Sequence, residues 1–98
     1  MRVGNFEIRE ILYDHDRYEI VKWEDCEPFL TEAPSGQMKY ASQYCYTIAY
    51  LIWDEDEEVF NLESVGMRLA HAAPPPEVFK AICIFADNER YARIEGDE

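Results

Sequence analysis

The feature that most constrains this sequence is an apolar stretch from Tyr44 to Trp53, which runs directly into five consecutive acids, Asp54 to Glu58. Ten residues rich in aromatic and β-branched side chains are typical of a strand. Successive side chains alternate between the two faces of a strand, and here both faces are largely apolar, so we expect a central strand covered on both sides. The acidic run predicts a turn, and the residues from Glu58 to Val65 predict the return strand.

The preceding residues supply the rest of the predicted sheet. Asn5 to Tyr13 alternates apolar and polar side chains, although a short helix is also compatible with its pattern. Asp14 to Arg17 is a turn cluster, and Tyr18 to Trp23 is rich in β-branched and aromatic residues, so we interpret the two segments as a hairpin. Residues 24–43 contain two prolines and a Ser-Gly pair without a sustained period. They predict a long surface loop, with room for a short edge strand.

The C-terminal third predicts a helix packed on this sheet. Residues 66–73 leave the sheet and three prolines follow, the last of which is favourable as the first residue of a helix. From Glu77 to Arg90 the apolar side chains recur on two adjacent stripes, as expected for a helix laid across a sheet. One stripe consists of Val78, Ile82 and Phe85, and the other of Phe79, Cys83 and Ala86. A second hairpin turning at Asp87-Asn88 is the alternative, so residues 77–94 remain open between helix and hairpin.

These segments predict one α+β domain over residues 1–98. We expect an antiparallel sheet of about four strands, built from two hairpins, with a C-terminal helix packed on one face. The long loop or a second copy of the chain would cover the other face of the central strand. Residues 95–98 are expected to form a frayed acidic tail.

The charge balance restricts the partners of this chain. Twenty-one acids against nine bases leave a formal net charge of −12. Direct binding to nucleic acid or to an anionic membrane needs clustered lysine and arginine, so we expect neither. A basic protein surface is the partner that this charge favours, unless the acids serve solubility alone. No apolar run approaches the ~20 residues that span a bilayer, and no signal-like region follows Met1, so we expect a cytoplasmic location.

The sequence offers no catalytic, metal or cofactor signature. Cys26, Cys45 and Cys83 lack zinc-site spacing, so we expect structural thiols. Three adjacent residues in a turn, as in Asp14-His15-Asp16, point in different directions and do not converge on a metal. The five-acid run lacks the spacing and the internal glycine of a calcium loop. We therefore expect a protein that is not an enzyme and that binds no cofactor or metal.

Two groups of side chains are candidates for partner binding. The acidic group comprises Asp54, Glu55, Asp56, Glu57 and Glu58 together with Asp14, Asp16, Glu24, Asp25 and Glu27. Acids on one side of a strand recur about every 6.7 Å, and phosphates rise about 3.4 Å along each DNA strand, so an acidic edge is able to mimic nucleic acid. The aromatic group comprises Tyr40, Tyr44, Tyr46 and Tyr50 on one face of the central strand and Trp53 on the other. An open aromatic face suits a protein interface or a homodimer.

The segment YCYTIAYLIWDEDEEVFNLESVGMRL resembles a pattern found in small uncharacterised proteins of bacteriophages and mobile elements. In that pattern an E-I-V-x-W hairpin precedes an aromatic strand, an acidic turn, a V-G-x-R segment and a helix. Glu19 to Trp23 and Val65 to Arg68 are the matching positions, and the resemblance spans roughly residues 5–90. It implies no activity. With the charge, it favours an inhibitor that occupies the basic nucleic-acid-binding surface of a host defence or DNA-processing protein. The alternative is a structural or regulatory homodimer that uses the tyrosine face.

Overall fold

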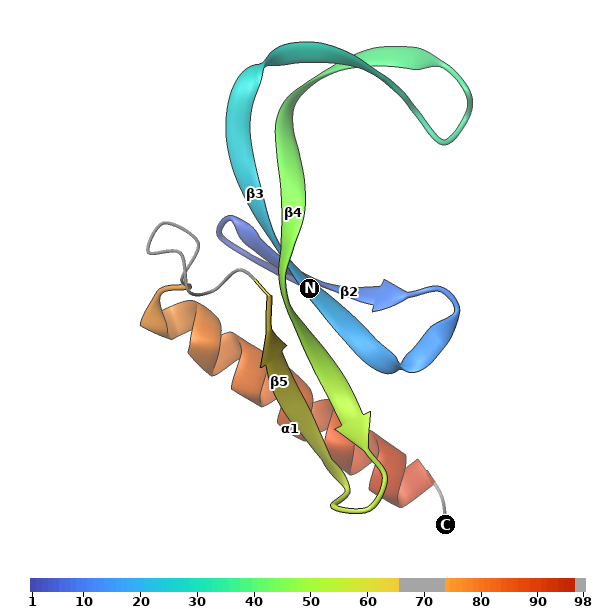
Figure 1. Ribbon diagram of the computed structural model, residues 1–98, viewed down its shortest axis with the longest axis vertical. Helices are drawn as coiled ribbons and strands as arrows, with labels where there is room; N and C mark the ends of the chain where they lie inside the picture. The colour runs from blue at the N-terminus through green and yellow to red at the C-terminus, as the bar shows by residue number, and fades with distance from the viewer. Residues whose placement is uncertain (66–73, 97–98) are drawn as a thin grey trace.

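The computed structural model describes residues 1–65 and 74–96 and has an α+β fold, a five-stranded antiparallel sheet with one C-terminal helix (Figure 1). The strands are β1 (Arg2–Val3), β2 (Phe6–Ile11), β3 (Asp14–Glu32), β4 (Met38–Asp54) and β5 (Val59–Ser64), and the helix is α1 (Pro76–Gly96). The strands lie in the sheet in chain order. The predicted class is confirmed, and the fifth strand arises because Arg2 and Val3 pair back onto β2.

The N-terminal hairpin forms as predicted, but its turn lies earlier in the chain. Ile11 pairs with Asp14, so only Leu12 and Tyr13 form the turn, and both are exposed. The residues from Asp14 to Arg17, predicted as the turn, already belong to β3. Their side chains therefore lie at the beginning of the longest strand in the sheet instead of on a loop.

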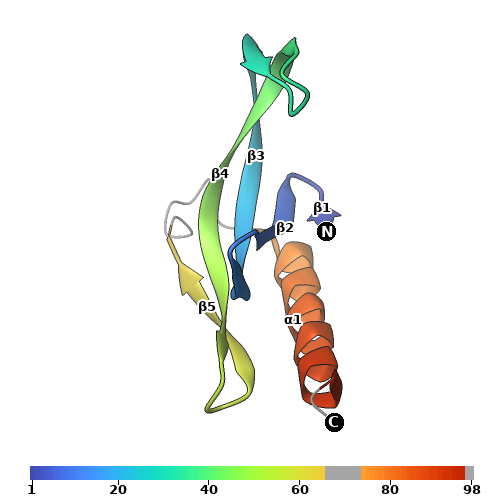
Figure 2. The same ribbon diagram turned by 90° about the vertical axis from the view of Figure 1, so that its right-hand side faces the viewer.

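Residues 24–43 are mostly strand, which corrects the predicted surface loop. β3 continues to Glu32 and β4 begins at Met38, so the two strands project beyond the helix as a bent ribbon (Figure 2). We call residues 24–45 the arm. Between Asp25 and Phe29 the register of β3 carries extra residues, one of which is Pro28. A β-bulge accommodates a residue that lacks a backbone N–H, so the proline that suggested a loop marks a bulge instead.

Helix α1 begins at the third proline, as predicted, and the alternative hairpin over residues 77–94 is wrong. The first predicted stripe faces the sheet: Val78 and Ile82 are buried, and Phe85 packs against the core. Of the second stripe, Ala86 also packs against the core, whereas Cys83 is exposed and Phe79 is 39% exposed. The helix continues to Gly96, which shortens the predicted tail; residues 97–98 and 66–73 lie outside the described residues.

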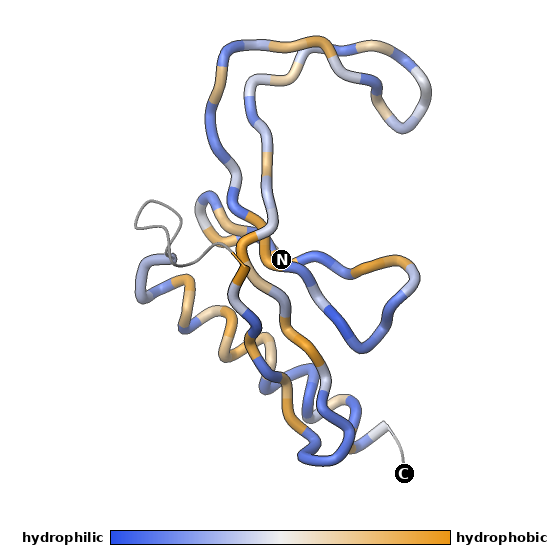
Figure 3. Tube along the Cα trace, viewed as in Figure 1, coloured by the Kyte–Doolittle hydropathy of each residue, from blue (hydrophilic) through white to orange (hydrophobic). Residues whose placement is uncertain are grey.

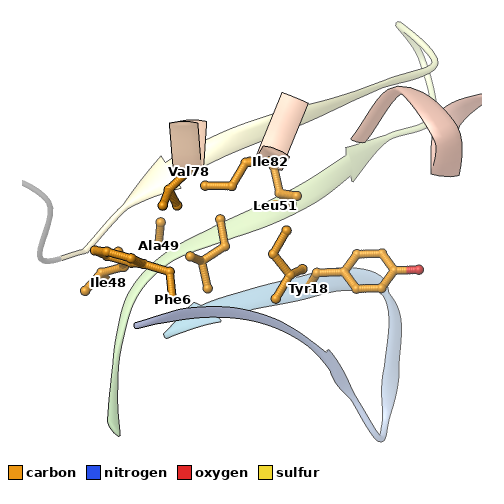
Figure 4. Packing of buried hydrophobic residues seen from close by; sticks show 9 residues of the cluster. Phe6, Tyr18, Ile48, Ala49, Leu51, Val78 and Ile82 are labelled. Atoms are coloured by element: carbon orange, nitrogen blue, oxygen red, sulfur yellow. The ribbon is translucent and has the colours of Figure 1, made fainter. Parts of the chain in front are cut away.

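The hydrophobic core lies between α1 and the middle of the sheet (Figure 4). Its buried members are Phe6, Ile8, Tyr18, Ile20, Ile48, Ala49, Leu51, Val78 and Ile82. A bulge in β4 adds one more buried side chain to the core. Ile20 pairs with Ala49 and Val21 with Thr47, which leaves Ile48 as an extra residue that is fully buried.

The bulge at Ile48 also changes which residues of β4 share a face. Tyr46 pairs with Lys22, which pairs with the core residue Phe6, so Tyr46 lies on the face that α1 covers. Tyr50 pairs with Glu19, and the partner of Glu19 on β2 is Arg9, on the opposite face from the core. The single tyrosine face of the prediction is therefore wrong, because one extra residue reverses the alternation.

The face away from α1 is not the apolar surface that the sequence predicted. Arg9 forms an ion pair with Glu19, and the Thr47 hydroxyl donates to Glu19 at 3.0 Å. Trp23 Nε1 donates to Glu7 Oε1 at 3.2 Å. The central strand is thus covered by helix on one face and bordered by a polar network on the other.

Candidate protein-binding surfaces

The long strands β3 and β4 carry two candidate surfaces at their opposite ends. At one end lie the acids at the beginning of β3 and the acidic β4–β5 turn, and we call Asp14, Asp16 and residues 54–58 the acidic end. Arg17 pairs with Ile52, so the beginning of β3 lies beside the end of β4. The hydrophilic residues of the β4–β5 turn are visible at this end in Figure 3. The acids of β3 and of the β4–β5 turn therefore lie at the same end of the sheet, which the sequence left open.

Three of the predicted acids lie elsewhere. Glu24 pairs with Tyr44 and Asp25 with Gln43, and Glu27 follows them in the bulge of the arm. At the rise of a strand, Glu24 is about 23 Å from Arg17, which lies at the acidic end. The composite acidic surface that the sequence suggested is therefore divided between the acidic end and the arm.

The turn between β4 and β5 is held by its first acid. The Asp54 Oδ1 atom accepts hydrogen bonds from the backbone N–H groups of Asp56 and Glu57 at 3.0 and 3.2 Å. Glu58 closes the turn in the left-handed region, with φ of 56°, and its N–H donates to the Asp54 carbonyl. Asp54 is thus a structural residue of the turn. Residues 55–57 are exposed at its outer surface.

The C-terminal half of α1 binds the beginning of β3 and the β4–β5 turn. The Arg93 guanidinium donates to Asp16 Oδ1 at 2.7 Å and to the His15 carbonyl, and it lies 5.1 Å from the ring centroids of Trp53 and Phe60. Burial alone would lower the pKa of Arg93, but the hydrogen bonds to Asp16 and Tyr18 outweigh it and raise that pKa. Sequence analysis missed Arg93, because its partners lie more than seventy residues away.

Two further arginines, Arg17 and Arg90, bind at the acidic end and offset part of its negative charge. Arg90 Nε donates to the Glu58 carbonyl at 2.6 Å, and Arg17 Nε lies 3.4 Å from Asp14 Oδ2. Asp14 and Asp16 are therefore both paired with arginine. Among the described residues, the exposed acidic side chains at this end that form no such ion pair are those of residues 55–58.

We expect Arg93→Ala to lower the free energy of unfolding by about 2 kcal/mol, because it removes two charged hydrogen bonds and two ring contacts. Arg93→Lys keeps the charge but not the planar fork, so its loss should be intermediate. Urea denaturation monitored by circular dichroism measures both. Lys80→Ala, at an exposed position on the same helix, is the control and should change stability by less than about 0.5 kcal/mol. Equal losses in the alanine variants would contradict a clamp at Arg93.

The second candidate surface is the arm, whose large apolar side chains are exposed. They are Phe29, Leu30, Met38, Tyr40 and Tyr44, and Tyr40 is 76% exposed. Several of them line a broad open groove on the arm, together with Trp23. Phe29, Leu30 and Met38 were not among the predicted interface residues. The alternation of large and small side chains in MKYASQY was the signal that the strand begins at Met38.

The predicted aromatic residues occupy three different places. Tyr44 lies on the arm, 6.2 Å from Tyr46 between ring centroids, and the Tyr46 hydroxyl donates to Glu24 Oε1 at 3.1 Å. Tyr50 lies on the opposite face beneath the Arg17 guanidinium, 5.4 Å away. Trp53 packs against Phe60 at the acidic end, at 4.9 Å. The structure therefore leaves Tyr40 and Tyr44 as the tyrosines of the arm that are available to a partner.

No metal centre is visible in the part of the chain that the structure describes: residues 1–65 and 74–96 contain no group of three or more His, Cys, Asp or Glu side chains arranged around one point. His15 is exposed, and the contact it makes to Arg93 uses its backbone carbonyl. Cys26, Cys45 and Cys83 are free thiols. Over the same residues, no helix is both long enough and apolar enough to cross a bilayer.

Comparison with known proteins identifies no relative. No family model matches the chain, and no curated protein or solved structure shows significant similarity to it. The resemblance to phage and mobile-element proteins therefore stays a prediction.

Proposed function

We propose that this chain is a non-catalytic binding protein whose acidic end occupies a basic surface of another protein. The placement of the acids of β3 and of the β4–β5 turn at one end of the sheet carries the proposal. The carboxylates of residues 55–57 project from a turn that Asp54 caps and that Arg90 fastens to the helix, and Arg93 binds Asp16 beside it. A held turn loses little conformational freedom on binding, so its charges act at low entropic cost.

The partner class that fits these charges is a protein with a basic nucleic-acid-binding cleft. Such clefts attract closely spaced negative charges, and a protein surface with comparable charges competes with the phosphate backbone. The resemblance to phage proteins points the search to defence and DNA-processing enzymes. In this role the chain is an inhibitor that blocks access of nucleic acid to its partner.

The test compares two variants with the same change of charge. Glu55→Gln/Asp56→Asn/Glu57→Gln removes three charges from the turn and leaves Asp54 in place as its cap. Asp25→Asn/Glu27→Gln/Glu32→Gln removes three charges from exposed positions on the arm. Each immobilised chain is exposed to a host lysate at low salt, and the retained proteins are then challenged with double-stranded DNA.

We expect wild type and the arm variant to retain the same protein, and DNA or high salt to release it. The turn variant should bind that protein about tenfold or more weakly, because it loses the charges that guide and hold the complex. Retention that is equal in both variants, or that DNA does not reverse, would exclude capture of a nucleic-acid-binding cleft by the turn.

A further inference from the structure

The arm has two long strand edges, and neither has a neighbouring strand among the described residues. β2 accompanies β3 up to Lys22, with one further backbone bond from Trp23 to Asn5. β5 accompanies β4 from Ala49 onward, and Val65 bonds to the Ile48 carbonyl. Within residues 1–65 and 74–96, the outward edges of residues 25–32 and 38–47 therefore have no neighbouring strand. An open edge offers backbone N–H and C=O groups for pairing with another strand.

The two edges differ in the features that protect a strand from such pairing. Residues 24–32 carry several acids, and Pro28 lies in a bulge that interrupts the ladder. Acids, proline and bulges are the devices with which natural sheets prevent edge pairing. Residues 38–47, MKYASQYCYT, contain no acid, no proline and one lysine, and they pair regularly with β3 on either side of its bulge. The β4 edge is thus the unprotected one.

We propose that the edge from Met38 to Thr47 pairs antiparallel with the same edge of a second copy, about a two-fold axis at Ser42. The side chains on one face of this segment are Met38, Tyr40, Ser42, Tyr44 and Tyr46. This order is nearly self-complementary about its centre, so the axis places Tyr40 opposite the partner's Tyr44 and places the two serines opposite each other. A two-fold interface requires such self-complementarity, and aromatic cross-strand pairs stabilise antiparallel strands.

The charge distribution allows two copies to meet at this edge despite the net charge of −12 on each. The one charged side chain on the edge from Met38 to Thr47 is that of Lys39. The acids of the arm, Glu24, Asp25, Glu27 and Glu32, lie on the far strand; Glu24 is paired with Lys22 at 2.9 Å, and Asp25 accepts a hydrogen bond from Gln43 at 2.7 Å. Asp54 follows Gln43 by eleven residues, about 36 Å of strand, several times the Debye length of about 8 Å at physiological salt. Salt therefore screens the acidic ends of the two copies from each other.

Pairing of two copies would also stabilise the arm. A two-stranded ribbon is marginally stable in water, whereas four strands with a shared aromatic face support one another. The dimer joins the two arms into one four-stranded ribbon and covers the exposed rings of Tyr40 and Tyr44. This inference is independent of the function proposed for the acidic end.

The first test is the mass in solution, measured by sedimentation equilibrium over a range of concentrations. We expect wild type at twice the chain mass of 11.6 kDa. Tyr40→Lys/Tyr44→Lys should raise the dimer dissociation constant by about a hundredfold or more, because it places charges in the centre of the interface. Leu30→Lys is the matched control, since Leu30 is also exposed on the arm but lies on β3, and it should remain dimeric. A monomeric wild type, or a double variant that dimerises normally, would overturn the proposal.

The second test examines the register, in a chain whose three native cysteines are serine. Ser42→Cys places two thiols directly opposite each other, with Cβ atoms about 4.5–5.5 Å apart, close to the distance that a disulfide bridges. Mild oxidation should cross-link this variant rapidly. Ser35→Cys, in the turn at the end of the arm, should cross-link slowly because the axis separates the two turns. Cross-linking of Ser42→Cys no faster than of Ser35→Cys would exclude the two-fold axis at Ser42.

Discussion

Replacement of Ile20 by alanine is expected to lower the free energy of unfolding by about 3 kcal/mol. Ile20 is fully buried at the centre of the sheet, where it pairs with Ile8 on one side and Ala49 on the other. The substitution removes apolar contacts and leaves a cavity that a small core cannot easily fill. Domains of this size are stable by about 5–15 kcal/mol, so the loss is a large fraction of the total.

Urea denaturation followed by tryptophan fluorescence measures this loss. Leu30→Ala is the matched control, because Leu30 lies on the same strand but is 54% exposed in the arm. It should lower stability by less than about 1 kcal/mol. A comparable loss at the two positions would mean that the arm contributes as much to the fold as the core does.

Replacement of Ile82 by lysine is expected to have a larger effect, about 4 kcal/mol or more. Ile82 and Val78 are the buried residues of α1, and in Figure 4 both point from the helix to the β4 side chains beneath. A lysine at position 82 either buries its charge or moves the helix away from the sheet. In both cases the apolar face formed by Ile48, Ala49 and Leu51 loses its cover.

Ile84→Lys tests whether this effect depends on position. Ile84 lies two residues further along the helix and is 51% exposed, so the same substitution should cost less than about 1 kcal/mol there. The two variants are compared by urea denaturation, and by limited proteolysis, which should cleave α1 of Ile82→Lys first. Equal stability of the two variants would contradict the orientation of α1 on the sheet.

The parts of the fold that the sequence predicts are those specified by neighbouring residues. The apolar run from Tyr44 to Trp53 followed by five acids specifies a strand and a turn locally. The proline at position 76 and the spacing of Val78, Ile82 and Phe85 likewise specify the helix and its buried stripe. None of these patterns depends on what the distant chain does, and the structure contains each of them.

The parts that the sequence does not predict depend on pairing between distant residues. In the sequence alone Pro28 indicates a loop, whereas the pairing of β3 with β4 shows that a β-bulge accommodates it. The sequence around Ile48 alternates regularly and gives no sign of an extra residue in the strand. The bulge at Ile48 nevertheless places Tyr50 on the opposite face from Tyr46. The candidate site depends on such long-range placement as well. Seven of the predicted acids converge because Arg17 lies beside Ile52, and Arg93 joins them from the end of the chain.

The length of β4 has a further consequence, because this one strand connects the arm to the acidic end. Along its contour, β4 measures about 40 Å from Ser42 to Asp54, and it bends within the arm (Figure 1). If two copies pair at Ser42 as we propose, the dimer would be a bivalent ligand whose acidic ends lie less than about 80 Å apart. A target that presents two basic sites at that span would be bound through both ends at once. The second contact would form at the effective concentration that the length of the connecting strands sets, so the avidity would exceed the affinity of either end.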